Sequence, residues 1–247
     1  MRVILTGASG RMGRQMLALF QSAGDIEVIA VDKKVSDDGE YGCIVARYSD
    51  ICDVKESAVA IVDFSLHTAT CEVVEFAVKR NIPLVIATTG HTAYERGYIE
   101  KASAQIPVFM ASNMSVAIEY IKRFSAKLAQ IFPDADIEII EAHHAKKIDS
   151  PSGTALSVAK RIVRERGFGK VVVGRGMGRE KGEVNVHSLR IGASLGEHEV
   201  IIDTTGERIV LRHEVFCRSV YAEGALRALR FVLTQSKGLY GIEDILP

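Results

Sequence analysis

The stretch Gly7-Ala8-Ser9-Gly10-Arg11-Met12-Gly13 decides the fold, because it turns the chain from a strand into a helix. Before it, the apolar run Arg2–Thr6 predicts a buried strand, and after it apolar residues at helical spacing predict a helix from Arg11 to Ser22. A second strand is predicted over residues 26–31. A strand, a helix and a strand in this order call for a right-handed crossover and a parallel sheet. The opening of the chain therefore predicts an α/β domain.

The same alternation continues to about residue 111. Three further runs rich in Val and Ile predict strands over residues 59–64, 84–87 and 108–111, with helices near Thr68–Arg80 and Tyr94–Ser103 between them. These runs lack strict polar alternation, which is typical of strands covered on both faces. We therefore expect five parallel strands with helices on both sides of the sheet.

A different pattern begins near Met114. A long helical repeat stops at Pro133, a strand follows over residues 136–142, and a helix is predicted from Gly153 to Arg166. The chain then reads as strands separated by glycines, at Lys170–Val173, Val184–Arg190, His198–Thr204 and Arg208–Val215. This predicts a second, mixed or antiparallel sheet. The closing helical pattern, residues 222–236, is expected to return and cover the first sheet.

Composition excludes several classes of protein. Lys and Arg number 31 and Asp and Glu number 31, so the formal net charge is zero and general nucleic-acid binding is disfavoured. The 47% apolar content predicts a folded globular chain, and no apolar run is long enough to cross a membrane. The cysteines, Cys43, Cys52, Cys71 and Cys217, form no C-x-x-C pair, so we expect reduced thiols in the core and a cytoplasmic protein.

The glycine turn has the position and composition of a pyrophosphate-binding loop. Glycines let phosphates approach backbone N–H groups at the start of a helix, and Arg11 can add charge-assisted hydrogen bonds. A glycine turn can also be only a tight connection. However, Asp32 ends the second strand 19 residues after Gly13, where a carboxylate can accept hydrogen bonds from the adenosine ribose. We therefore expect a dinucleotide site.

Lys33 and Lys34 follow Asp32 directly and can receive a 2′-phosphate, which would allow NADPH as well as NADH. The alternative is that they are solvated residues at a strand end. Two later strand ends carry small and polar residues, Ala87-Thr88-Thr89-Gly90 and Ala111-Ser112-Asn113-Met114. Ligands of parallel sheets bind at this carboxyl edge, although ordinary capped turns have a similar composition.

The segment from Glu141 to Ala155, EAHHAKKIDSPSGTA, concentrates the most chemistry. His143, His144 and Lys147 lie next to a predicted helix start at Gly153 and Thr154, so the segment can donate protons and receive a carboxylate or phosphate. Adjacent residues of a strand point to opposite faces, which argues against metal chelation by the two histidines. Neither serine of this segment stands in the G-x-S-x-G elbow of serine hydrolases. The remaining alternative is a basic solvated loop.

The other histidines have no predicted role. His67 and His91 begin segments where a cap or a surface position suffices, and His187, His198 and His213 fall in predicted strands. Histidines in strands are often structural.

These motifs resemble those of the 4-hydroxy-tetrahydrodipicolinate reductase family, which acts in the diaminopimelate branch of lysine biosynthesis. The resemblance covers essentially the whole chain. It rests on the glycine turn, Ala87-Thr88-Thr89-Gly90, the histidine-lysine segment ending in Pro151-Ser152-Gly153-Thr154-Ala155, Gly196-Glu197-His198 and Gly206-Glu207-Arg208. The histidine-lysine segment is specific, whereas many dehydrogenases share the glycine turn.

The resemblance implies a Rossmann-like dinucleotide domain over residues 1–113, completed by residues 216–247. It also implies an α+β domain with a mixed sheet over residues 114–215, which binds substrate and forms a homotetramer. No metal is implied. Two positions depart from the family pattern, Lys146, where some members have histidine, and Ser150, where alanine is usual.

The resemblance also assigns roles to matching residues. Cofactor contacts would fall on Gly7 to Met12, Asp32, Ala87 to Thr89 and Ala111 to Met114. Substrate contacts would fall on His144, Gly153 and Thr154, and our hypothesis places the carboxylates of the substrate against Lys147 as well. His143 and Lys147 would transfer protons while NADH or NADPH supplies the hydride.

Two other functions compete with this interpretation. A different nicotinamide-dependent reductase of a small carboxylated metabolite would share the glycine turn without needing the histidine-lysine segment. A redox-sensing regulator would need a DNA-binding module, and the sequence shows no basic recognition segment.

Overall fold

A computed structural model describes residues 1–34, 41–176 and 178–246. The chain divides into two compact units, which we call unit 1 (residues 1–114 and 218–247) and unit 2 (residues 115–217). The first unit ends at Met114 rather than at the expected Asn113, and the second ends at Cys217 rather than at Val215. The expected α/β class, with a parallel sheet and a separate mixed sheet, is confirmed.

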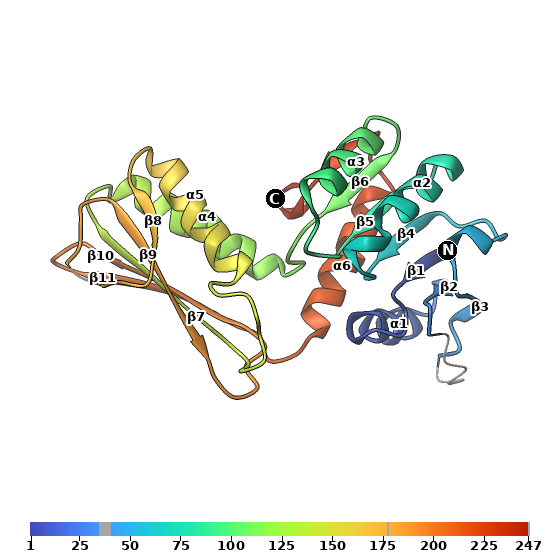
Figure 1. The fold of residues 1–247 in the computed structure, drawn as a ribbon, viewed down its shortest axis with the longest axis horizontal. Coiled ribbons are helices and arrows are strands. Elements are labelled where there is room, and N and C mark those ends of the chain that lie inside the picture. The colour runs from blue at the N-terminus through green and yellow to red at the C-terminus, as the bar shows by residue number, and fades with distance from the viewer. Residues whose placement is uncertain (35–40, 177, 247) are drawn as a thin grey trace. The chain divides into compact units, whose positions relative to one another are not determined.

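Unit 1 is built on a parallel sheet. Among the described residues it has seven strands in the order β12-β6-β5-β4-β1-β2-β3 (Figure 1). Every neighbouring pair is parallel, so the carboxyl ends of the strands share one edge of the sheet. The strands are β1 (Arg2–Thr6), β2 (Glu27–Val31), β3 (Ile44–Tyr48), β4 (Ala60–Asp63), β5 (Leu84–Ile86), β6 (Pro107–Met110) and β12 (Gly238–Tyr240).

The prediction of five strands in this sheet was wrong, because both edge strands were missed. β3 pairs with β2 at one edge, and β12 pairs with β6 at the other. β3 is covered only in part, and β12 has three residues, so neither carries the continuous apolar run of a central strand. Their pairing is decided by the sheet they join rather than by their own sequence.

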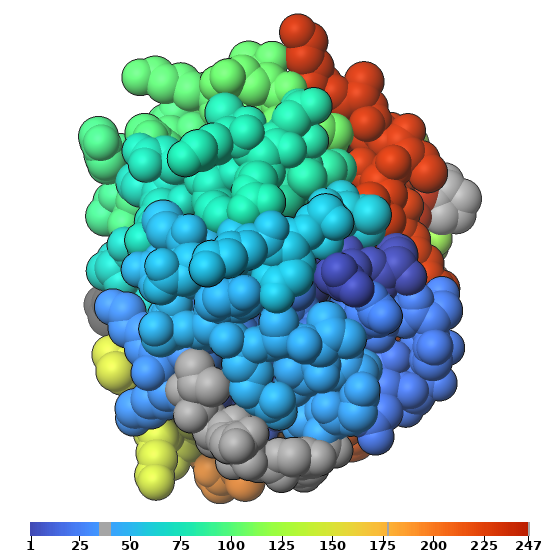
Figure 2. Space-filling view, turned by 90° about the vertical axis from the view of Figure 1, so that its right-hand side faces the viewer, coloured from blue at the N-terminus to red at the C-terminus, as the bar shows by residue number. Residues whose placement is uncertain are grey.

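Helices cover both faces of this sheet (Figure 1). α1 (Arg11–Ala23) and α6 (Ser219–Val232) pack together on one face, and α2 (Thr70–Arg80) and α3 (Ala93–Ser103) on the other. The predicted return of the C-terminal helix is confirmed. Gly224 permits it, because a Cβ there would lie 1.7 Å from the Met114 carbonyl oxygen. The chain beyond α6, red in the space-filling view of Figure 2, reaches the surface.

Short 3-10 turns link several of these elements. They are η1 (Ile51–Asp53), η2 (His67–Ala69) and η3 (Ile242–Ile245). η1 and η2 follow β3 and β4, and they lie near the carboxyl edge of the sheet.

Unit 2 contains the mixed sheet, in the order β11-β10-β7-β9-β8 for the described residues. β7 pairs with β9 in parallel and with β10 antiparallel. α4 (Val116–Ile131) and α5 (Gly153–Arg166) pack on one face over a core of Ile, Val and Ala. The strands are β7 (Asp136–His143), β8 (Lys170–Val173), β9 (Glu183–Arg190), β10 (Glu197–Asp203) and β11 (Arg208–Glu214).

The other face of this sheet is partly apolar. Strand alternation places Ile140, Leu189, Ile201 and Val210 there, opposite the core residues. No helix within the described residues of unit 2 covers this face. Leu189 is 52% exposed and Val210 is 48% exposed.

The cysteines differ from the expectation of core thiols. All four lie in described parts of the chain and form no disulfide, but Cys52 and Cys217 are exposed and Cys43 and Cys71 only half-buried. The helix patterns already fill the core with Leu, Ile, Val and Phe, which leaves the thiols at its margin. None of the described helices is long and apolar enough to cross a membrane.

Candidate active site

The glycine turn brings three backbone segments into close contact. Gly7 has a φ of +70°, and a Cβ there would lie 2.4 Å from the Phe64 carbonyl oxygen. At Gly13 a Cβ would lie 2.2 Å from the Gly7 carbonyl oxygen. Side chains at these positions would displace the loop. Gly10 is the N-cap of α1 and makes no side-chain cap, so the helix begins on bare backbone.

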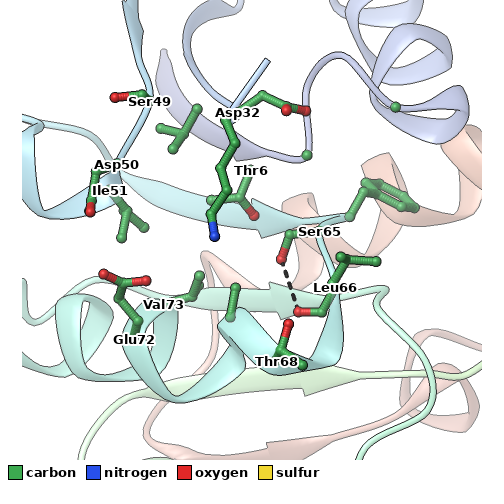
Figure 3. Close-up of a pocket in the computed structure, with 16 residues that line it drawn as sticks. Thr6, Asp32, Ser49, Asp50, Ile51, Ser65, Leu66, Thr68, Glu72 and Val73 are labelled. Carbon is green, nitrogen blue, oxygen red and sulfur yellow. Dashed lines mark hydrogen bonds between the residues drawn. The ribbon is translucent and has the colours of Figure 1, made fainter. Parts of the chain in front are cut away.

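A pocket of about 320 Å³ opens beside this turn, at the carboxyl ends of β1 and β2 (Figure 3). Four of the predicted cofactor residues, Gly7, Gly10, Asp32 and Lys33, line it. Val31, Ile51 and Val73 contribute apolar walls, which suit a flat aromatic ring.

The Asp32 carboxylate is held next to the turn. It accepts hydrogen bonds from the backbone N–H of Ser9 and of Lys34, both at 3.0 Å. The Ser9 hydroxyl in turn donates to the Lys34 carbonyl oxygen at 2.7 Å. The turn and the end of β2 are thus joined through Asp32.

Several residues of this pocket were not predicted from the sequence. Figure 3 shows Ser49, Asp50 and Ile51, from the segment after the unpredicted β3, with Glu72 beside them and Thr68 farther along the pocket. Recognising them required knowing that β3 lies beside β2. The turn after β4, Phe64-Ser65-Leu66, also lines the pocket, and its small polar Ser65 at a strand end was an available signal.

The strand ends after β5 and β6 reach the same edge of the sheet. Thr89 and Ser112 are exposed there, whereas Ala111 and Met114 are buried. The Thr88 hydroxyl donates to the buried Asp63 carboxylate at 2.9 Å, so its side chain supports the strand ends rather than facing a ligand.

One cluster in the described residues has a metal-like composition. Single ligand atoms of Asp50, Cys52 and Glu72 lie within 4.8 Å of one another. All three side chains are exposed, and nothing else at this place indicates an ion. We assign no metal to it, and the expected absence of a metal stays a prediction.

In unit 2 the histidine-lysine segment is organised by Glu141. Alternation along β7 puts Glu141 and His143 on the same face, and His143 Nδ1 lies 2.5 Å from Glu141 Oε2. Arg190 of β9 donates to both Glu141 oxygens at 3.0 and 2.8 Å. Burial raises the pKa of Glu141, but the hydrogen bonds from His143, Arg190 and the Ser152 N–H outweigh it and lower the pKa to about 2. The carboxylate is therefore ionised.

Two further histidines lie behind His143. The ring of His198 packs edge-on against His143 with centroids 5.4 Å apart, and the His213 ring lies 6.3 Å beyond it. Burial, together with the neighbouring His143 and His213, lowers the pKa of His198 to about 3. His198 is therefore neutral at physiological pH. The sequence predicted no role for His198 or His213.

Lys147 and the start of α5 complete this part of unit 2. Lys147 Nζ lies 2.7 Å from Asp149 Oδ1. Burial raises the pKa of Asp149, but the hydrogen bond and the positive charge of Lys147 outweigh burial, so the pKa is lowered. The Ser152 hydroxyl caps α5 by accepting from the Ala155 N–H at 3.2 Å. The helix thus starts at Gly153 and Thr154, with no acidic residue in its first turn to oppose an anion.

Comparison with known proteins identifies the family. The family model described as "Dihydrodipicolinate reductase, N-terminus" matches residues 1–114, and "Dihydrodipicolinate reductase, C-terminus" matches residues 117–246. The chain belongs to the dihydrodipicolinate reductase family. The resemblance inferred from the sequence is confirmed, and the members of this family are oxidoreductases.

Similar curated proteins carry the name 4-hydroxy-tetrahydrodipicolinate reductase. The one from Caldanaerobacter subterraneus subsp. tengcongensis is 38% identical, over 99% of this chain and 98% of its own length. The one from Methanoregula boonei is 33% identical, over 99% of this chain and 97% of its own.

Solved structures agree on the fold. A dipicolinate-bound dihydrodipicolinate reductase from Paenisporosarcina sp. TG-14 is similar with a TM-score of 0.78 and 23% identity, covering 99% of both chains. The WlbA dehydrogenase of Thermus thermophilus, solved with NAD and UDP-GlcNAcA, has a TM-score of 0.61 and 12% identity over 99% of this chain and 91% of its own. The reductase and the dehydrogenase thus share this arrangement of elements.

Because His198 is buried and has a lowered pKa, we expect the free energy of unfolding to fall in mild acid. An unfolded chain takes up a proton at the ordinary histidine pKa of 6.5, whereas the folded protein keeps His198 neutral down to about pH 3. The unfolded state binds more protons between these values, so stability falls as pH falls through them. From pH 6.5 to pH 5 the expected loss is roughly 2 kcal/mol.

Urea unfolding measured at pH 7, 6 and 5 checks this. His198→Gln should lower stability at pH 7 but flatten its dependence on pH, so the slope is the readout. Equal slopes for the wild type and the variant would contradict the assignment.

Proposed function

We propose that this protein reduces 4-hydroxy-tetrahydrodipicolinate to tetrahydrodipicolinate with NADH or NADPH, with loss of water, in the diaminopimelate route of lysine biosynthesis. The observation that supports it best is the linked set of His143, Lys147 and the start of α5 at one end of β7, in a chain of this family. A basic solvated loop would not need a buried carboxylate to hold its histidine.

Unit 1 has the features that a nicotinamide dinucleotide requires. The glycines at positions 7 and 13 leave no room for a Cβ, Gly10 leaves the start of α1 without a side-chain cap, and Asp32 lines the pocket beside them. In our proposal the turn and Arg11 hold the pyrophosphate, and Asp32 holds the adenosine ribose. When bound, the cofactor supplies a hydride.

Unit 2 supplies charge and protons. We propose that His144, Lys147 and the N–H groups of Gly153 and Thr154 bind the two carboxylates of the substrate. His143 faces the Glu141 carboxylate with Nδ1, which leaves Nε2 for proton transfer to the reacting ring. Lys147 assists that transfer. The first unit thus positions the reductant and the second the acid.

We further propose that four copies of the chain assemble through the uncovered face of the mixed sheet. That face exposes Leu189 and Val210, and apolar sheet surfaces of this kind are usually covered by a partner. The cytoplasmic location and the absence of a nucleic-acid partner stay predictions from the sequence.

The kinetic roles of the two histidines should separate. His143→Gln should lower kcat by about 10²- to 10⁴-fold, because it removes a general acid. His144→Gln should act mainly on KM, since a carboxylate contact of equal strength in the ground and transition states contributes to binding alone. Lys147→Ala should affect both constants.

The assay follows NADH absorbance with enzymatically generated substrate, and separate NADH binding confirms that unit 1 is intact. Wild-type kcat/KM in all three variants would contradict the proposed chemistry.

Cofactor choice depends on the lysines after β2. Removing Lys33 and Lys34 together should lower kcat/KM for NADPH on the order of tenfold, because charge-assisted contacts to a 2′-phosphate are lost. Use of NADH should stay within about twofold. Lys79→Ala, an exposed lysine near the end of α2, is the matched control. Unchanged use of NADPH by the double variant would remove the role proposed for both lysines.

The assembly can be measured by light scattering. The wild type should have a mass near four times 27.0 kDa. Val210→Glu should give smaller species, because a carboxylate would be buried in the proposed interface. Tyr94→Glu places the same charge on a more exposed site of unit 1, 74% exposed, and should leave the mass unchanged. A wild-type monomer at micromolar concentration would contradict the proposal.

A further inference from the structure

Glu141, near the end of β7, accepts hydrogen bonds from several parts of unit 2. Its side chain is fully buried, with 0% exposed. Its two oxygens accept hydrogen bonds from the His143 ring, both terminal nitrogens of Arg190 and the backbone N–H of Ser152. One carboxylate therefore connects β7, β9 and the start of α5.

We propose that Glu141 is the positioning residue of the substrate site. It would fix the imidazole that donates the proton and, through its second oxygen, the backbone that receives the substrate carboxylate. This inference rests on the proposed function and assigns a residue that the function itself did not require.

The first effect is on the tautomer of His143. An ionised carboxylate can only accept hydrogen bonds, so the proton between the two groups belongs to His143 Nδ1. The imidazolium form of His143 carries its second proton on Nε2, and this is the proton that it gives to the substrate, which leaves the neutral ring with its proton on Nδ1. The edge-on His198 ring, 5.4 Å away, also limits rotation of the imidazole. Glu141 thus sets which nitrogen reacts and where it points.

The second effect is on the start of α5. Glu141 Oε1 accepts from the Ser152 N–H at 3.1 Å, and Ser152 is the N-cap of the helix. The next two N–H groups belong to Gly153 and Thr154. Their position relative to His143 is therefore set through a single side chain.

Arg190 helps to keep the Glu141 carboxylate charged and also contacts the segment that carries Lys147 and Asp149. It donates to both Glu141 oxygens and also to the Asp149 carbonyl oxygen at 2.6 Å. The Asp149 carboxylate pairs with Lys147. The groups facing His143 are thus Glu141 on its own strand, Arg190 on β9 and His198 on β10.

A double-mutant cycle tests the proposal. Glu141→Gln preserves the shape but cannot accept hydrogen bonds from both Arg190 nitrogens. Alone, it should lower kcat about 10- to 100-fold and raise KM severalfold, because the imidazole and the helix start both lose their anchor. In the His143→Gln background it should lower kcat less than about threefold further, since no imidazole is left to orient. In the His144→Gln background the full loss in kcat should return.

A merely structural role predicts a different pattern. General loosening of unit 2 would lower kcat by the same factor in all three backgrounds, and that additivity would overturn the inference. Wild-type kinetics in Glu141→Gln, or an unchanged kcat in His143→Gln, would overturn it as well. If Glu141→Gln does not fold, Arg190→Lys replaces it. Lysine keeps the charge but not the paired hydrogen bonds, and its loss in kcat should likewise vanish in the His143→Gln background.

The cycle also separates the two proposals. A wild type that does not oxidise NADH in the presence of substrate overturns the proposed function and this inference with it. An active wild type whose Glu141→Gln loss is additive with that of His143→Gln overturns the inference alone.

Discussion

The pairing of the buried Glu141 carboxylate with Arg190 is the interaction on which the organisation of unit 2 depends. A carboxylate without solvent is costly unless hydrogen bonds replace its hydration, and here they come from three different elements. Each of those elements is thereby held in place by the same charge. The neutral His198 alongside adds no competing positive charge to the group. Stability and site geometry in this unit have one origin.

Unit 1 uses the same device at its own ligand edge. The buried Asp63 carboxylate at the end of β4 accepts from the hydroxyls of Thr6 and Ser65 at 2.5 Å and from that of Thr88 at 2.9 Å. These residues belong to or follow three adjacent strands, β1, β4 and β5. The strand ends that carry the glycine turn and the Thr88 segment are therefore fixed to one another before any ligand binds, which reduces the ordering cost of binding.

Sequence alone predicted what local patterns determine. The central strands, the helices and the mixed second sheet follow from runs and periodicities, and the glycine turn follows from its place between strand and helix. The edge strands β3 and β12 could not be predicted, because their pairing depends on the sheet they join. Glu141 and Arg190 lie 49 residues apart, and only the parallel register of β7 with β9 brings them together. No role was predicted for His198, because its lowered pKa comes mainly from burial, which the neighbouring residues in the sequence do not reveal.

The two departures from the family pattern, Lys146 and Ser150, lie outside the hydrogen-bond network around Glu141. Lys146 and Ser150 are both exposed, whereas Glu141 and Ser152 are buried and His143 and Lys147 are half-buried. Lys146 is exposed, and interactions between exposed charges are weak because water surrounds them, so Lys146 perturbs the neighbouring charged groups little. The residues that must keep a fixed geometry are those in contact with the buried carboxylate, directly or through Arg190. Positions on the outer side of the loop can vary because nothing in the hydrogen-bond network passes through their side chains.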